Sequence, residues 1–252
     1  MRIRSLRLSV AVVASTVAAA TVVATGGVAS ADIDFGSSGG SFGSSAAPGE
    51  MTITLVRHAE SAGNASGLID TKVPGPNLTD LGRSQAAKLA TQLAANKFDA
   101  AFASNMVRTQ QTGAPTAANH HLTINVQPGF REIEAGDYEG TPEAAAMTGY
   151  LQAPIKWLSG DRNARIPGSI DGNEFDKRFD DALLNVQRRG STHPVIFSHG
   201  GTIMFWSMMN ANNADPSKLG TDPMRNGGHV TLKGSPQKGW TIVEWVGHPD
   251  LG

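Results

Sequence analysis

The sequence contains no cysteine, and this absence removes several kinds of chemistry at once. Disulfides, a thiolate nucleophile and cysteine-held zinc or iron–sulfur sites are excluded. An excess of one charge is also missing, because 21 basic side chains nearly balance 22 acidic ones for a formal net charge of −1. So small a net charge provides no general field for binding nucleic acid or an acidic membrane surface. Any anion must therefore be bound locally, by a few well-placed donors.

Long apolar runs are scarce too, and the N-terminus holds the one exception. Three arginines among the first seven residues precede an apolar stretch over residues 8–24, and Ala29-Ser-Ala31 offers the small residues that a signal peptidase accepts. The alternative is a retained membrane anchor, but a span needs about 20 strongly apolar residues, and this stretch is rich in Ala, Ser and Thr. We expect a signal peptide over residues 1–31, export to the cell envelope or medium, and no stable membrane span after cleavage.

The next segment, residues 32–50, has too few apolar groups to offset the entropy of ordering it, and it includes GSSGGSFGSS. We predict a Gly/Ser-rich flexible linker there. A folded catalytic domain should then occupy residues 51–252, a length that fits one globular domain.

Short apolar segments alternate with segments of helical periodicity through this domain. Strands are predicted at residues 51–56, 98–103, 122–126, 193–197, 228–232 and 240–246. Helices are predicted at residues 78–95, 106–118, 141–158, 172–189 and 200–210. The alternation predicts an α/β fold, a three-layer α/β/α sandwich around a mostly parallel central sheet.

Two predicted strands end in a histidine, in Val56-Arg-His-Ala-Glu60 and in Phe197-Ser-His-Gly-Gly201. One such histidine is more often structural than catalytic. In open α/β sheets, however, ligands bind beyond the carboxyl ends of the strands, where His58 and His199 would lie together. Gly200 would let the backbone approach a ligand closely, and the helix that follows would present free N–H groups.

Arg57 and Arg108 are the candidate cations for this place. Arg108 follows the strand at 98–103 and stands at the start of a helix. A guanidinium binds two phosphate oxygens at once, and a phosphoryl group in transfer needs several such donors. The residues therefore favour a phosphoryl-binding site.

The segment Leu55-Val-Arg-His-Ala-Glu-Ser61 resembles the signature of the histidine phosphatase superfamily, the phosphoglycerate-mutase-like proteins. The resemblance continues in order through Leu78-Thr-Asp-Leu-Gly82, Arg108-Thr-Gln-Gln-Thr112, Arg131-Glu-Ile-Glu-Ala-Gly-Asp-Tyr-Glu-Gly140 and Phe197-Ser-His-Gly-Gly201. Ala59 and Tyr138 replace the glycine and tryptophan common at those places, which removes no required group. The RHGxRxP pattern of the acid phosphatase branch is missing, so the resemblance is to branch 1.

The resemblance implies a role for each matching residue. His58 would be the nucleophile, and Arg57 and Arg108 should keep its ring neutral by like-charge repulsion. Glu132 would be the general acid that protonates the leaving alkoxide and then the base that activates water. Residues that would hold the phosphoryl oxygens are Arg57, Ser61, Asn64, Arg108, His199 and Gly200. Motif position alone places Glu132 ahead of its neighbours Glu134 and Asp137, and Glu132 could instead pair with Arg131.

These roles predict a secreted phosphatase that hydrolyses phosphate monoesters through a phosphohistidine, with no metal and no other cofactor. The first alternative is a phosphoglycerate-type phosphomutase, which in this family carries an extra basic stretch after the acid loop; residues 143–154 contain no Lys or Arg. The second is a non-catalytic phospho-ligand binding module, which would typically lack a histidine or the acid. A metal-dependent hydrolase would need a ligand cluster that the sequence does not offer.

The substrate class stays open at this level, between a small molecule and a larger phosphorylated partner. Four residues of the segment expected to cap the site are compatible with an apolar alcohol: Tyr150, Leu151, Trp157 and Leu158. Three cations are compatible with an extended anionic substrate or with simple solvation: Arg162, Arg165 and Lys177. Met204 and Trp206 are expected in the core.

Overall fold

The computed structural model describes residues 49–251. The predicted signal peptide and nearly all of the predicted linker lie outside the described residues. Within the described range, no helix combines the length and apolar character that crossing a membrane requires. The first strand begins at Met51, the first residue of the predicted domain.

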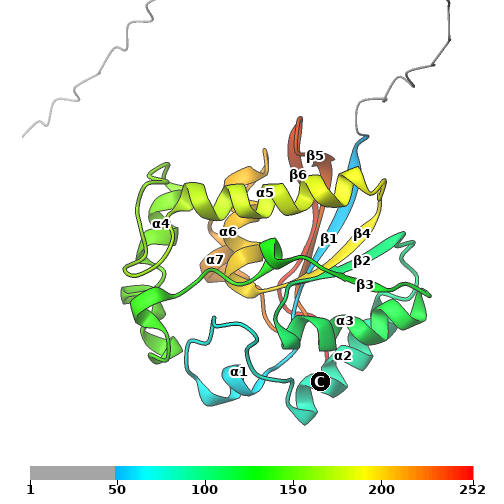
Figure 1. The fold of residues 1–252 in the computed structure, drawn as a ribbon, viewed down its shortest axis with the longest axis horizontal. Coiled ribbons are helices and arrows are strands. Elements are labelled where there is room, and N and C mark those ends of the chain that lie inside the picture. The colour runs from blue at the N-terminus through cyan, green and yellow to red at the C-terminus, as the bar shows by residue number, and fades with distance from the viewer. Residues whose placement is uncertain (1–48, 252) are drawn as a thin grey trace, which may run out of the picture. The chain divides into compact units, whose positions relative to one another are not determined.

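Six strands form one sheet in the order β3-β2-β4-β1-β5-β6 (Figure 1). Their bounds are β1 Met51–Arg57, β2 Ala100–Ala103, β3 Ile124–Val126, β4 Pro194–Ser198, β5 His229–Ser235 and β6 Gly239–Val246. The four strands β1 to β4 pair in parallel, whereas β5 runs antiparallel to β1, and β6 antiparallel to β5. The predicted mostly parallel sheet is confirmed, and each predicted strand overlaps an observed one.

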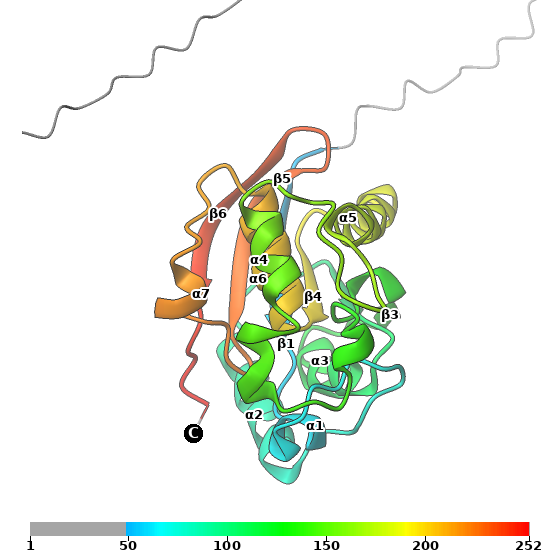
Figure 2. The same ribbon diagram turned by 90° about the vertical axis from the view of Figure 1, so that its left-hand side faces the viewer.

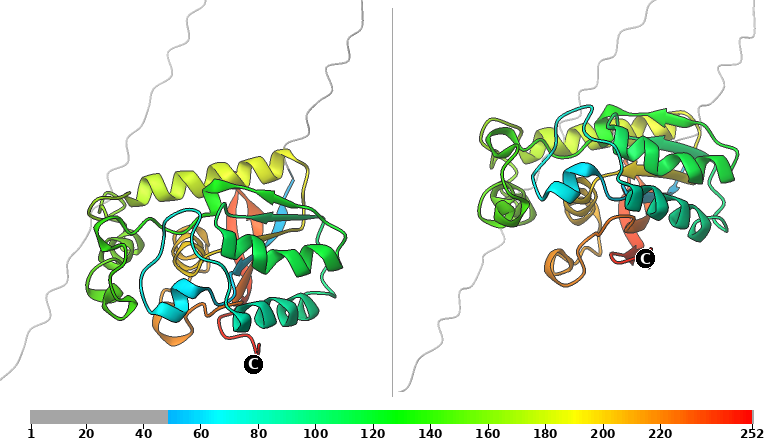
Figure 3. Two further views of the ribbon diagram at one scale, coloured as in Figure 1. Left: turned by 60° about the horizontal axis from the view of Figure 1, so that its bottom comes forward. Right: turned by 90° about the horizontal axis from the view of Figure 1, so that it is seen from below.

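The helices cover both faces of the sheet. Their bounds are α1 Ala62–Ser66, α2 Asp80–Gln92, α3 Val107–Asn119, α4 Gln152–Leu158, α5 Gly172–Arg188, α6 Gly200–Asn210 and α7 Lys218–Thr221. On one face α4 and α6 lie side by side (Figure 2). On the other, α2 and α3 lie side by side (Figure 3).

Alternate side chains of β1 pack into two different hydrophobic cores, one on each face of the sheet. Leu55 packs in the core that contains Phe179 of α5 and Trp206 of α6. Its neighbour Val56 packs in a second core, with Leu89 of α2. Successive side chains of a strand point to opposite faces, so each β1 residue contributes to one layer only. The three-layer α/β/α sandwich is thereby confirmed.

The prediction of one continuous helix over residues 141–158 is wrong. A 3-10 helix at Glu143–Thr148 ends at Gly149, and α4 starts only at Gln152. A Cβ on Gly149 would lie 2.8 Å from the Tyr138 ring, so the chain passes close to this ring at the residue where the 3-10 helix ends. Helix α1 was not predicted either; Ser61 caps it by accepting from the Asn64 N–H, a signal that owes nothing to apolar periodicity.

Candidate active site

The parallel pairing of β1 with β4 determines where the two histidines lie. Arg57 is opposite Ser198 in the register, and the His58 N–H donates to the Ser198 carbonyl at 3.0 Å. His58 and His199 therefore leave the sheet side by side, with ring centroids 5.1 Å apart and edge to face. A cavity of about 280 Å³ opens at this place. The cavity is lined by Arg57, His58, Ser61, Asn64, Arg108, Glu132 and Gly200, among others.

His58 is held as one defined neutral tautomer. Its Nδ1 lies 2.8 Å from the carbonyl oxygen of Ala59, which can only accept, so Nδ1 carries the proton. Arg108 donates from Nε to Nε2 of His58 at 3.1 Å, so Nε2 presents its lone pair. Burial, followed by the charges of Arg108 and Arg57, lowers the pKa of His58 well below its usual value. The predicted direction is correct, although burial rather than the arginines is the main cause.

His199 stands directly before α6 and is fully buried. Its Nε2 lies 2.8 Å from the hydroxyl of Ser104, while its Nδ1 is buried without a partner among the described residues. Burial is the main cause that lowers the pKa of His199, with Arg108 and His58 adding to it. Ser104 was not predicted as a site residue, although its place immediately after β2, at the carboxyl end of a parallel strand, is a signal that could have found it.

Each of the two arginines has a buried nitrogen with no partner among the described residues. Arg57 donates from Nη1 to the Met224 carbonyl at 2.6 Å, and Arg108 donates from Nη2 to the Asp70 carbonyl at 3.0 Å. Arg57 Nε and Arg108 Nη1 are buried and have no partner among the described residues. Buried polar groups are rarely left unpaired. Together with Nδ1 of His199, these atoms can donate hydrogen bonds to the oxygens of an anion.

Two glycines make room for this arrangement. A Cβ on Gly75 would lie 2.6 Å from Arg108 Nη1, and the positive φ of Gly75, 68°, suits glycine in any case. A Cβ on Gly200 would lie 3.1 Å from Arg57 Nε. The predicted role of Gly200 in close backbone approach is consistent with this contact.

Glu132 is held at the N-terminus of α6. The Thr202 N–H donates to Oε1 at 2.8 Å, the Thr202 hydroxyl donates to the same oxygen at 3.0 Å, and the Gly201 N–H donates to Oε2 at 3.2 Å. Arg178 holds the main chain at this place, donating to the carbonyl oxygens of Arg131 at 3.0 Å and of Glu132 at 3.4 Å. The carboxyl group is thus fixed at the cavity by contacts that the sequence did not reveal, because Arg178 lies on α5, far along the chain.

The rivals of Glu132 lie elsewhere. Glu134 forms ion pairs with Arg131 and Arg178 and does not line the cavity, and neither does Asp137. The alternative in which Glu132 pairs with Arg131 is wrong, because the partner of Arg131 is Glu134. Of these three carboxylates, Glu132 is the one that lines the cavity together with His58.

Asn64 and Ser61 line the cavity together. Asn64 Oδ1 accepts from the Ser61 N–H at 3.2 Å and from Asn226 Nδ2 at 3.2 Å. Asn226 also donates to the carbonyl of His58 at 3.0 Å, a contact that no sequence pattern indicates. Because these contacts use the amide oxygen of Asn64, its Nδ2 group can donate to a ligand.

The outer wall of the cavity is apolar. Tyr150 and Leu151 line it as predicted, whereas Trp157 does not, since its ring is buried in the core and stacks on Phe175. Leu158 is likewise missing from the wall. Met204 was expected in the core, but it is partly exposed and lines the cavity.

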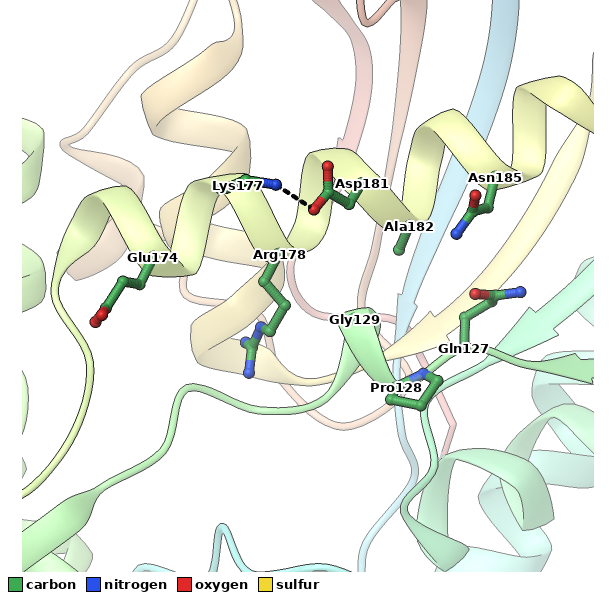
Figure 4. A pocket seen from close by; sticks show the side chains of 9 residues that line it. All are labelled: Gln127, Pro128, Gly129, Glu174, Lys177, Arg178, Asp181, Ala182 and Asn185. Atoms are coloured by element: carbon green, nitrogen blue, oxygen red, sulfur yellow. Dashed lines mark hydrogen bonds and ion pairs between the residues drawn. The ribbon is translucent and has the colours of Figure 1, made fainter.

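The three surface cations that could have bound an extended anion are in ion pairs outside the cavity. Arg162 pairs with Asp176, Arg165 with Asp171 and Lys177 with Asp181. The last pair lies beside a second hollow, of about 480 Å³, formed by α5 and the segment 127–129 (Figure 4). That hollow contains none of the predicted site residues, so it is separate from the candidate active site. Among residues 49–251, no three His, Asp or Glu side chains gather as a set of metal ligands would.

Known proteins resemble this chain in sequence and in fold. The sequence model of the histidine phosphatase superfamily (branch 1) matches residues 53–247. The chain is 39% identical over 215 residues to the PE-PGRS family protein PE_PGRS11 of Mycobacterium tuberculosis. This match covers 79% of this chain but only 37% of the longer relative. Two solved structures share the fold: the mycobacterial glucosyl-3-phosphoglycerate phosphatase (TM-score 0.64, 18% identity, 79% of this chain and 100% of that one) and a phosphoserine phosphatase from Entamoeba histolytica (TM-score 0.64, 22% identity, 80% and 100%).

Proposed function

The chain belongs to branch 1 of the histidine phosphatase superfamily, and on that premise we propose that it hydrolyses phosphate monoesters through a phosphohistidine on His58, without a metal ion. One observation carries the proposal. Three buried nitrogen atoms that have no partner among the described residues, Arg57 Nε, Arg108 Nη1 and His199 Nδ1, belong to side chains beside a neutral histidine whose Nε2 presents a lone pair. This arrangement suits a tetrahedral anion in front of a nucleophile.

In the first step the phosphoryl oxygens accept hydrogen bonds from Arg57, Arg108 and His199. Arg108 turns its Nε–H from His58 to an oxygen of the substrate, which frees the lone pair of Nε2. The lone pair attacks phosphorus, the phosphorus–oxygen bond to the alcohol breaks, and Glu132 gives its proton to the departing alkoxide.

The second step reverses these roles. Glu132, now ionised, takes a proton from water, the resulting oxygen attacks phosphorus, and the bond from phosphorus to Nε2 breaks with its electron pair returning to the ring. The phosphorylated ring keeps its proton on Nδ1 and gains positive charge, which the Ala59 carbonyl stabilises at 2.8 Å. The same histidine is thereby ready for another cycle.

Glu132 must be protonated when the first step begins. A substrate dianion bound beside it supports this state, since a second negative charge nearby disfavours the carboxylate form. After the proton has left, the hydrogen bonds from Thr202 and Gly201 keep the carboxylate in place at the cavity.

The cavity favours a phosphatase over a phosphomutase. A mutase of phosphorylated acids must hold a second anionic group, whereas Arg57 and Arg108 are the only lysine or arginine residues among the described residues that line this cavity. Both are already engaged in the phosphoryl pocket. We also propose that the protein is exported, an assignment supported by the sequence of residues 1–31 alone.

The test is hydrolysis of phenyl phosphate by the purified protein in the presence of EDTA. The proposal predicts turnover that EDTA leaves unchanged, and a loss of about a thousandfold or more in His58→Ala. His193→Ala, at an exposed site far from the cavity, serves as the matched control and should keep full activity. Hydrolysis that survives in His58→Ala, or that stops in EDTA, would contradict the mechanism.

A further inference from the structure

The positive charge of the cavity is concentrated at its inner end. Arg57 is the last residue of β1 and Arg108 contacts His58, and no other lysine or arginine of the described chain lines the cavity. Once a phosphoryl group occupies that end, both guanidinium groups are engaged. The part of the cavity that receives the alcohol therefore has no cation to offer.

That outer part is instead built from apolar side chains of several elements. They are Leu68, Met147, Tyr150, Leu151, Met204 and Phe205. The Tyr150 hydroxyl donates to the Ile133 carbonyl at 2.6 Å, so the ring faces the cavity while its polar end is already satisfied. Burial also raises the pKa of Tyr150 well above its usual value, which keeps the side chain neutral. An alcohol placed here meets hydrocarbon and an aromatic ring.

Two carboxylic acids complete the wall. Asp70 and Glu143 both line the cavity in addition to Glu132. Glu143 is exposed, and its charge acts to raise the pKa of Arg57, so this cavity-lining acid is within electrostatic reach of the phosphoryl site. An anionic substituent on the alcohol would meet like charges, which disfavour binding.

Given the phosphatase function proposed above, we infer that the preferred substrates are phosphate monoesters of apolar alcohols without a second negative charge. The apolar wall contributes binding free energy in proportion to the area that the alcohol buries. The acids at the wall select against phosphorylated carboxylic acids. Both the apolar contact and the charge repulsion depend on the leaving group, so both should change kcat/KM.

The test compares 4-methylphenyl phosphate with 4-carboxyphenyl phosphate, two esters of the same size in which the same bond breaks. We expect kcat/KM to be about tenfold or more lower for the carboxylated ester, because of like-charge repulsion. Glu143→Gln should reduce the ratio of kcat/KM between the methyl ester and the carboxylated ester severalfold. Glu174→Gln, an exposed acid on the separate hollow of Figure 4, should leave the ratio unchanged.

A second variant tests the same wall by gain of function. Met147 lines the cavity and is 60% exposed, so Met147→Lys introduces a cation without disturbing the core. This variant should raise kcat/KM for 4-carboxyphenyl phosphate relative to the methyl ester, while Met147→Gln should not.

The outcomes separate this inference from the proposed function. If both esters are hydrolysed with dependence on His58, and the carboxylated ester reacts equally fast or faster, the inference is overturned and the phosphatase function stands. If neither ester reacts and no phosphohistidine forms from either, the proposed function fails as well.

Discussion

Arg108 donates a hydrogen bond from Nε to Nε2 of His58 at 3.1 Å, so a permanent cation contacts the nitrogen that would attack phosphorus. The contact requires a lone pair on Nε2 and therefore a neutral ring. The same guanidinium can also bind the substrate, because its Nη1 has no partner among the described residues and can donate to a phosphoryl oxygen. Arg108 thus keeps His58 in the nucleophilic form before the substrate arrives and holds the substrate afterwards.

Replacing Arg108 should be costly even with another cation. Arg108→Lys retains a positive charge but loses the planar group that contacts His58, Asp70 and the anion together. We expect kcat/KM for phenyl phosphate to fall about 10²- to 10³-fold, the usual effect of removing one such donor. Steady-state kinetics with a circular dichroism check of folding measures it. A lysine variant within threefold of the parent would contradict the role given to Arg108.

The pH dependence should reflect histidines whose pKa values are lowered by burial. In the folded state His58 and His199 bind protons more weakly than at their usual pKa of 6.5, so the unfolded chain binds more protons near and below that pH. The free energy of unfolding should therefore decrease as pH falls through about 6.5. Equally, His58 should remain neutral below pH 6.5, and nitrogen NMR should find its Nε2 unprotonated at pH 6. A protonated Nε2 at that pH would contradict this account.

Glu132→Gln should separate the two chemical steps. An amide cannot give a proton to the alkoxide, so hydrolysis of phenyl phosphate should slow about a hundredfold or more. With 2,4-dinitrophenyl phosphate, whose leaving group needs no proton, the first step should persist and the slow second step should let the phosphoenzyme accumulate. Rapid mixing should show a burst of dinitrophenol. Equal losses for both esters, without a burst, would rule out Glu132 as the acid.

Asp180 provides a stability prediction away from the site. Burial raises the pKa of this α5 residue from 3.8 to about 6, while Trp206 donates to its Oδ1 at 3.0 Å. The folded carboxyl group binds its proton more tightly than the unfolded one, so ionisation above pH 6 destabilises the protein. Asp180→Asn, which keeps the acceptor for Trp206, should raise the free energy of unfolding by about 1–2 kcal/mol at pH 8, after allowance for partial solvent exposure.

This difference should largely disappear by pH 3, below the usual pKa of 3.8, where the carboxyl group is mostly protonated in both states. Chemical denaturation of parent and variant at the two pH values measures it. If Asp180→Asn is no more stable than the parent at pH 8, the buried charge of Asp180 does not destabilise the folded protein.

The sheet and the inner site could be predicted because their signals are local. Short β-branched segments mark β1 and β4, and a histidine directly after each strand is brought to the same edge by parallel pairing. Arg57, Arg108 and Glu132 follow from motifs that lie close to strand ends. The structure places Arg57, His58, Arg108 and Glu132 around one cavity, with His199 buried against the His58 ring, so the local patterns were sufficient for this part.

The remaining features depend on contacts between distant segments. The break at Gly149 lies against the Tyr138 ring, and the main chain at Glu132 is supported by Arg178 on α5. Met204 has the helical spacing of a core residue, yet it lines the cavity. Asn226 reaches His58 from a loop far along the chain. No periodicity or capping rule encodes these encounters, because each is decided by tertiary packing.

The most direct test of the central claim is to trap the covalent intermediate. Protein mixed with phenyl phosphate in EDTA and quenched within one turnover should carry one phosphoryl group, acid-labile and base-stable, on the peptide that contains His58. His58→Ala should abolish the adduct, and with 2,4-dinitrophenyl phosphate Glu132→Gln should increase its amount. Turnover with no such adduct, or an adduct on His199 instead, would contradict the assignment of His58 as the nucleophile.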